Sequence, residues 1–131
     1  EKAARGTDGR LWPWSDEWDP EWCNMKIAGP GETTPVGQYA PRGNSPYGCA
    51  DMAGNVWEWC STLYEAYPYR QDDGRENLEA SGGRVVRGGC WYDDDPGWVR
   101  CAFRPNFLPD GDCVYLGFRV ARGSRPSHPA P

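Results

Sequence analysis

The stretch from residue 47 to residue 60 decides the fold, and it reads Tyr47-Gly48-Cys49-Ala50-Asp51-Met52-Ala53-Gly54-Asn55-Val56-Trp57-Glu58-Trp59-Cys60. Its glycines and small polar residues predict a turn, and its end alternates aromatic and polar side chains as a half-buried strand does. Outward from it, residues 84–89 predict a second strand, with paired valines before a glycine bend. Residues 116–121 alternate in the same way. Weaker strand candidates cover residues 34–39 and 99–104.

The composition predicts one compact domain with many loops. The chain has 131 residues, of which only 16 are Leu, Ile, Val or Phe, while 8 are Trp and 7 are Tyr. Since each large aromatic side chain can bury roughly 150–250 Å², we expect a core built on indoles. Trp57, Trp59 and Phe118 are assigned to that core, and residues 11–25 to an ordered loop held down by its tryptophans. The 17 Gly and 13 Pro favour turns over long helices.

Charge and residue counts exclude several classes of protein. The net charge of −5 argues against a nucleic-acid partner, which would meet a basic face. No apolar run approaches the roughly 18 residues of a membrane span. The single histidine, His128, leaves no material for a Ser-His-Asp triad or a histidine-ligated metal. Six cysteines without a CxxC pair leave the compartment undecided, with the cytoplasm slightly favoured over the cell surface.

The two ends of the chain predict its domain organisation. Residues 1–6 are typical of a helix C-terminus closed by a glycine, so we expect the domain to continue upstream. The segment before Glu1, in the same domain or a larger polypeptide, is therefore an expected partner. We assign residues 1–122 to the domain and residues 123–131 to a disordered tail.

Three blocks of sequence resemble the formylglycine-generating-enzyme (sulfatase-modifying-factor) family, namely residues 54–59 (GNVWEW), 87–91 (RGGCW) and 116–121 (LGFRVA). The resemblance implies an α+β, C-type-lectin-like fold in this family's variant form, loop-rich with small twisted antiparallel sheets and little helix. The family's domain is longer, so the chain is similar to its C-terminal half.

The oxidase activity of the family depends on copper(I) held by two thiolates, which follow the motif that matches Arg87-Gly88-Gly89. Here Asp93 and, across a short deletion, about Trp98 match those two cysteines. Carboxylates do not replace thiolates on a soft ion. We therefore expect no copper and no enzyme. The alternative is an oxidase with displaced cysteines, Cys90 and Cys101.

A calcium site of the family matches Asp51, Gly54, Val56 and Glu58. Two carboxylates and two backbone carbonyls from a tight turn would supply the hard oxygen ligands that Ca²⁺ takes. The alternative is that Asp51 caps the turn and Glu58 pairs with an arginine. Framework arginines available for such pairs are Arg87, Arg100, Arg104 and Arg119.

Residues 91–115 mix aromatic, acidic and small residues as binding faces do, because rigid rings give contact area at low entropic cost. We predict that this surface recognises a protein ligand without catalysis. The alternative is a structural or regulatory remnant fused to an upstream effector domain. The predicted binding residues are Trp91, Tyr92, Asp93, Asp94, Asp95, Gly97, Trp98, Phe103, Pro105, Asn106, Phe107, Leu108, Gly111, Asp112, Cys113, Val114 and Tyr115.

The amino acids missing from the second half of the chain suggest a source of variation. Residues 1–83 contain 14 Lys, Glu, Gln or Met, and residues 84–131 contain none. An Asn codon whose two adenines are randomised encodes none of these four, and the predicted binding residues other than Trp91 and Trp98 are within its reach. This pattern resembles the variable proteins of diversity-generating retroelements, which display a randomised binding surface on this fold. Chance in a short, arginine-favouring stretch is the alternative.

Overall fold

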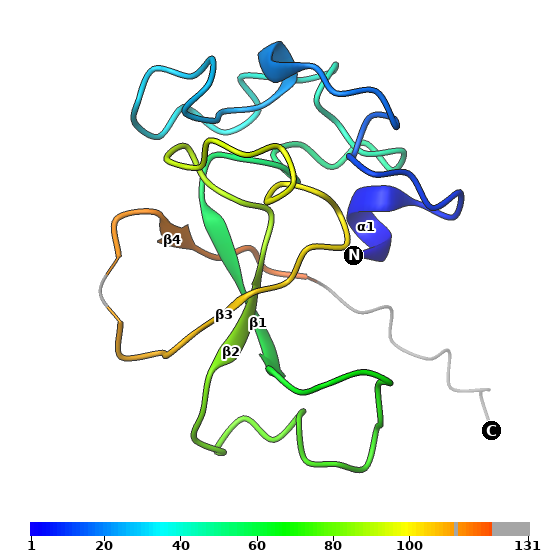
Figure 1. Ribbon diagram of the computed structural model, residues 1–131, viewed down its shortest axis with the longest axis vertical. Coiled ribbons are helices and arrows are strands. Elements are labelled where there is room, and N and C mark those ends of the chain that lie inside the picture. The colour runs from blue at the N-terminus through cyan, green and yellow to red at the C-terminus, as the bar shows by residue number, and fades with distance from the viewer. Residues whose placement is uncertain (112, 122–131) are drawn as a thin grey trace, which may run out of the picture.

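The computed structural model describes residues 1–111 and 113–121. Its elements are α1 (Lys2–Arg5), the 3₁₀ helix η1 (Pro20–Trp22) and the strands β1 (Trp57–Leu63), β2 (Arg84–Arg87), β3 (Asn106–Phe107) and β4 (Leu116–Gly117). The four strands form one small sheet at the centre of the molecule (Figure 1). None of the helices in this described part is long and apolar enough to span a membrane.

The sheet has the order β3-β2-β1-β4. β1 and β2 are antiparallel, with Glu58 opposite Arg87, and a bulge interrupts their register between Trp59 and Leu63. β2 and β3 are also antiparallel, but β4 runs parallel to β1. The predicted fold class is confirmed, but this pair and the isolated bridge between Asn24 and Gly54 are parallel and not antiparallel.

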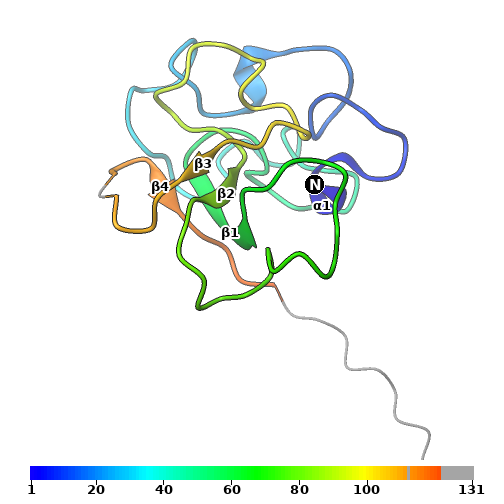
Figure 2. The same ribbon diagram turned by 60° about the horizontal axis from the view of Figure 1, so that its bottom comes forward.

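Loops gather at the two ends of the sheet. The segment 10–56 and the loop 88–104 lie at one end, and the loop 64–83 lies at the other (Figures 1 and 2). This arrangement places residues 91–104 of the predicted binding segment at the same end as the N-terminal loops, while the part after β3 lies beside the sheet.

Two of the weaker strand predictions are wrong. Residues 34–39 form turns, in which the backbone N–H of Gln38 donates to the carbonyl of Pro35. Residues 99–104 are also turns, although Val99 and Cys101 are buried. Buried and exposed side chains alternate here because the segment packs against the N-terminal loop. The Cys101 N–H donates to the Leu11 carbonyl of that loop (2.8 Å).

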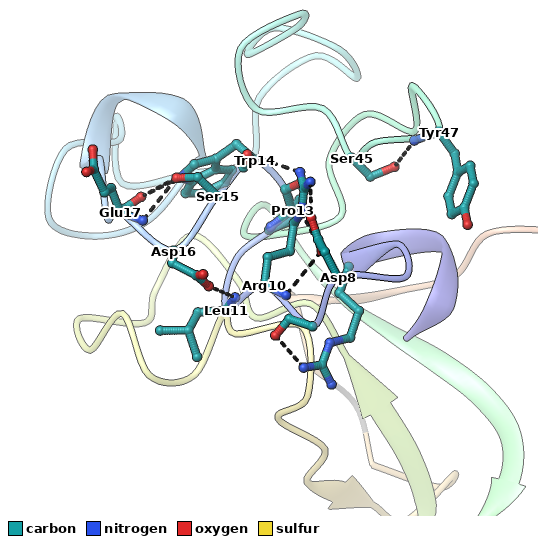
Figure 3. A network of polar contacts seen from close by, with 12 residues as sticks. Asp8, Arg10, Leu11, Pro13, Trp14, Ser15, Asp16, Glu17, Ser45 and Tyr47 are labelled. Carbon is teal, nitrogen blue, oxygen red and sulfur yellow. Dashed lines mark hydrogen bonds and ion pairs between the residues drawn. The ribbon is translucent and has the colours of Figure 1, made fainter.

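The N-terminal loop is ordered by its own polar contacts and by tryptophan packing, as predicted. Arg10 binds Asp8 through Nε (3.0 Å) and the Trp14 carbonyl through Nη1 (3.1 Å), and Asp16 accepts the Leu11 N–H (2.7 Å), as Figure 3 shows. The Trp18 ring lies 5.3 Å from that of Trp12 and 5.8 Å from that of Trp14, centroid to centroid. α1 ends at Gly6, whose N–H donates to the Lys2 carbonyl, as the predicted helix end requires.

The core consists of two clusters. One contains Trp12, Cys23, Met25, Ala53 and Val99, and holds the loops together. The other lies on the sheet and contains Trp57, Val86 and Cys90, against which Trp59, Phe103, Phe107, Tyr115 and Leu116 pack. Trp57 is in the core as predicted and Trp59 is half-buried. Assigning Phe118 to the core was wrong, because its side chain is 76% exposed.

The motif Gly54-Asn55 joins four loops. The side-chain oxygen of Asn55 accepts the Thr34 N–H (2.9 Å) and an N–H of the Asn24 amide (3.1 Å), and the Asn55 carbonyl accepts the Trp91 N–H (3.0 Å). Both residues have positive φ, which glycine and asparagine adopt with least strain. The Asn55 side chain therefore holds the loops of Asn24 and Thr34 together, and the Asn55 backbone carbonyl positions the loop 88–104 at Trp91.

Candidate functional site

An aromatic cavity of about 440 Å³ opens on the loop end of the sheet. Its walls come from β1, from the loop 88–104, from β3 and from the turn before β4. The lining residues are Trp57, Cys90, Tyr92, Asp93, Trp98, Phe103, Pro105, Phe107 and Tyr115. Seven of these nine belong to the predicted binding face, so the structure brings part of that face together around one cavity.

Tyr92 and Trp98 stand at the mouth of the cavity, with 56% and 45% of their surface exposed. Phe103, Phe107 and Tyr115 are half-buried and rest on the sheet cluster. Trp98 and Phe103 are nearly parallel, with an interplanar angle of 9° and a centroid distance of 6.5 Å. The cavity therefore has exposed rings at the rim and rings fixed by the core behind them.

Cys90 and Asp93 are the polar lining groups set deepest in the protein, because both are buried. Asp93 Oδ2 accepts the Cys90 N–H (2.8 Å), which closes the turn after Gly89. Burial raises the pKa of the Asp93 carboxyl, and it raises that of the Cys90 thiol to about 11. The prediction that Asp93 belongs to an exposed surface is therefore wrong, because Asp93 lies inside the cavity, where its charge is desolvated.

The remaining predicted binding residues lie outside this cavity. Leu108 lines a different hollow of about 660 Å³ beside the loop 64–83. Asp112 lies outside the described residues. The other predicted binding residues are close in sequence to the lining residues but do not line the cavity: Trp91, Asp94, Asp95, Gly97, Asn106, Gly111, Cys113 and Val114.

The four predicted calcium ligands do lie around one cavity. Asp51, Gly54, Val56 and Glu58 line a space of about 200 Å³ together with Arg119. Arg119 binds both carboxylate oxygens of Glu58, and its Nη2 donates to the Asp51 carbonyl (2.8 Å). Asp51 Oδ2 accepts the Gly37 N–H (2.7 Å). The donor set is hard oxygen and fits Ca²⁺ in kind, but Arg119 neutralises the Glu58 carboxylate that would bind the ion.

The arginines predicted for framework ion pairs divide into two kinds. Arg119 pairs with Glu58, and Arg87 pairs with Glu1 (3.2 Å). Arg100 instead donates to the Gly97 carbonyl, and Arg104 lies over the Tyr64 and Tyr67 rings. Within the described residues, neither Arg100 nor Arg104 forms an ion pair.

The two cysteines considered for a displaced copper pair have different surroundings. Cys90 lies in the sheet cluster beside the aromatic cavity, whereas Cys101 lies near Arg5 and Glu1. Burial raises the pKa of the Cys101 thiol to about 11, as it does for Cys90. Both thiols are therefore protonated at neutral pH, and Cu(I) would have to displace both protons to bind.

Three residues of this site were not predicted as binding residues. Trp57, which was predicted only as a core residue, and Cys90, which was considered only as a copper ligand, both line the cavity. Lys26, from the N-terminal loop, places Nζ 5.0 Å from the Tyr92 ring centroid and 3.7 Å from Asp94 Oδ2. No local pattern signals Lys26, because its neighbours are 66 and more residues away in the chain.

The fold and the site define a loop-rich domain of C-type-lectin-like architecture with an aromatic cavity at one end of its sheet. The sequence profile described as Sulfatase-modifying factor enzyme 1-like domain matches residues 1–124. The chain belongs to this family.

Relatives include both enzymes and proteins named otherwise. The chain is 37% identical to a serine/threonine-protein kinase pkn1 of Chlamydia caviae, with 86% of this chain and 18% of that protein aligned. It is 36% identical to a formylglycine-generating enzyme of Streptomyces coelicolor, over 92% of this chain and 43% of the enzyme. It is 32% identical to an inactive C-alpha-formylglycine-generating enzyme 2 of Bos taurus, over 95% and 42%. The chain thus spans less than half the length of each of these relatives.

Among solved structures, the chain is similar to Treponema denticola variable protein 1. The TM-score is 0.68 and the sequence identity 29%, over 88% of this chain and 41% of that protein. This similarity supports both the family and the predicted likeness to a variable protein.

Proposed function

We propose that this chain is a non-catalytic binding module that recognises a protein ligand through the aromatic cavity and its rim. One observation carries the proposal. Asp93 and Trp98, the residues that match the two copper-binding cysteines, both line the aromatic cavity. A carboxylate and an indole at these two positions supply no thiolate for Cu(I). They line instead a cavity large enough to bind a ligand.

The physical character of the cavity supports binding. Its volume of about 440 Å³ lies in the range of small-molecule and side-chain pockets. Tyr92 and Trp98 are exposed rings of the kind that dominate interface energetics. Because the half-buried rings behind them are held by the sheet cluster, little conformational freedom would be lost on binding.

The relatives fit this proposal. One relative is named as inactive, so this fold persists where catalysis is absent. A structure similar to this chain is named a variable protein. Six of the nine lining residues belong to the predicted binding face and are within reach of an adenine-randomised Asn codon: Tyr92, Asp93, Phe103, Pro105, Phe107 and Tyr115. The proposal therefore includes diversification of this cavity by a retroelement.

A peptide selection tests the binding function. Peptides from a random displayed library are selected on the full chain and then measured against Trp98→Ala and Tyr92→Ala. Each variant is expected to weaken binding by about tenfold or more, that is by about 1.4 kcal/mol, with little change in Tm. Leu78→Ala is the matched control, because Leu78 is 68% exposed in the loop at the opposite end of the sheet. Peptides that depend on Leu78 and not on Trp98 would contradict the proposal.

Two further measurements separate the alternatives. Tight one-to-one Cu(I) binding that is lost in Cys90→Ser, with oxidation of a cysteine in a substrate peptide, would support the displaced-cysteine oxidase instead. For diversification, the flanking DNA is sequenced. The proposal expects a near-identical repeat, rich in adenine at the codons of the six residues, beside a reverse transcriptase gene. Without such a repeat the diversification is wrong, and the binding function is judged by the peptide experiment.

We also propose that the cavity between Asp51 and Glu58 binds calcium. The backbone carbonyls of Gly54 and Val56 and the two carboxylates would hold the ion, which would stabilise the turn before β1. The ion would share Glu58 with Arg119 or displace it.

A further inference from the structure

We infer that the aromatic cavity takes a positively charged group, an ammonium or guanidinium side chain of the protein partner. The inference rests on the proposed binding function and names the chemistry that the cavity selects. Rings, a buried carboxylate and an ammonium group already bound at the rim each support it.

The rings provide the first argument. Six of the nine lining residues are aromatic, and none of the nine is Lys, Arg or His. The faces of aromatic rings carry negative electrostatic potential and attract cations, most strongly where water is excluded. Tryptophan gives the strongest such interaction, and Trp57 and Trp98 both line the cavity.

Asp93 provides the second argument. Asp93 is 5% exposed, and its carboxylate accepts the Cys90 N–H. No lysine or arginine of the described chain pairs with it. An ionised carboxylate in an apolar cavity is costly unless a cation accompanies it. Burial, and secondarily the nearby charge of Asp94, raise the pKa of Asp93, as expected for a carboxylate that lacks a counter-ion.

Lys26 provides the third argument. Its ammonium lies between the Tyr92 ring, at 5.0 Å from the centroid, and Asp94 Oδ2, at 3.7 Å. The rim therefore already binds an ammonium group between an aromatic face and a carboxylate. Lys26 is not among the residues that line the cavity, so it leaves the deeper rings and Asp93 available to a ligand. The exposed Asp95 would attract the same charge to the mouth.

Choline and its neutral isostere 3,3-dimethylbutan-1-ol test the inference. The two have the same shape and differ in one charge. Each is titrated into the full chain while the indole N–H signals of Trp57 and Trp98 are followed by NMR. We expect choline to bind about tenfold more tightly than the alcohol. In Asp93→Asn, which keeps an oxygen to accept the Cys90 N–H, the preference for choline should fall by about threefold or more, to what the rings alone provide.

Asp72→Asn is the control, because it removes the same charge from an exposed position in the loop 64–83. This variant should leave the preference for choline intact. Equal binding of choline and the alcohol by the wild type, or an undiminished preference in Asp93→Asn, would overturn the inference while leaving the binding function in place. If neither compound shifts the two indole signals and the selected peptides bind Trp98→Ala normally, the binding function itself fails.

Discussion

Arg119 binds Glu58 through two hydrogen bonds, from Nε to Oε2 (2.6 Å) and from Nη2 to Oε1 (2.5 Å). The same guanidinium donates to the carbonyls of Ala50 and Asp51. One side chain thus joins the segment after β4 to β1 and to the turn before it. Bidentate arginine–carboxylate pairs are among the stronger hydrogen-bonded contacts in proteins, so this pair would compete with an ion in the cavity that we propose binds calcium.

Arg119→Met should show whether Glu58 can bind calcium once Arg119 no longer pairs with it. Glu58, whose side chain is 17% exposed beside Arg119, loses its partner, and the free energy of unfolding should fall by about 1–3 kcal/mol. Calcium should restore most of the loss, because the ion now meets an unpaired carboxylate. The measurement is urea unfolding in excess calcium and in excess EDTA.

Glu58→Gln is the companion variant, since it removes the charged ligand and keeps the shape. Wild type should gain stability with calcium, by about 2.7 kcal/mol at a hundredfold excess over Kd, and Glu58→Gln should gain little. A wild type whose unfolding is the same in calcium and EDTA, together with an Arg119→Met that calcium fails to rescue, would show that the cavity holds no ion.

Gly54→Ala should destabilise the domain severely. Gly54 has a φ of +76°, and an added Cβ would lie 2.4 Å from the carbonyl oxygen of Asn24. Gly37→Ala is the matched control, with a φ of +80° and no atom within 4 Å of the added carbon. Thermal unfolding should show a loss of about 1–2 kcal/mol for the control, from backbone strain alone, and a clearly larger loss for Gly54→Ala. Equal losses would mean that the loops can move apart at this contact.

Trp57→Ala and Phe118→Ala should differ strongly although both remove a large ring. Trp57 is 4% exposed beneath the aromatic cavity, and its truncation should cost about 3–5 kcal/mol. Phe118 is 76% exposed, so its truncation should change stability by about 0.5 kcal/mol or less. Chemical denaturation of the two variants decides the matter. A large loss in Phe118→Ala would show that this ring is buried in solution.

Asp93 should make stability depend on pH in a way opposite to most carboxylates. Because its pKa is raised in the folded state, the folded protein keeps this proton to higher pH than the unfolded chain does. The stability that this group contributes is therefore lost as the pH rises from the ordinary pKa of an aspartate to the raised pKa of Asp93 in the folded state. Relative to wild type, Asp93→Asn should become more stable as pH rises through that interval.

The measurement is the free energy of unfolding of both proteins over a series of pH values. Glu1, Asp8 and Asp73 have lowered pKa values and contribute the opposite trend, but they do so equally in both proteins. A difference between the two proteins that does not change with pH would show that Asp93 is hydrated in the folded state.

Local patterns predicted the elements whose residues determine their own conformation. The alternation after Gly54 gave β1, the paired valines gave β2, and Gly6 ended α1. The alternation at residues 116–121 identified which side chains share a face, but not whether anything covers that face. Phe118, at 76% exposed, is therefore placed wrongly by pattern alone.

The site shows the same limit. Aromatic and acidic composition located the binding segment, because those residue types are informative wherever they lie. Composition could not separate the buried Asp93 from the exposed Asp94, since a turn closed by the Cys90 N–H makes that difference. Trp57 reaches the cavity, and Lys26 the Tyr92 ring at its rim, from distant segments, and only the tertiary structure brings them there.

The most direct measurement is a crystal structure of the full chain bound to a peptide from the selection. The account predicts that a side chain of the peptide enters between Trp98 and Phe107, that its charged end faces Asp93, and that no copper is held by Cys90. A peptide bound to the loop 64–83, or a copper ion coordinated by two cysteine sulfurs, would contradict it.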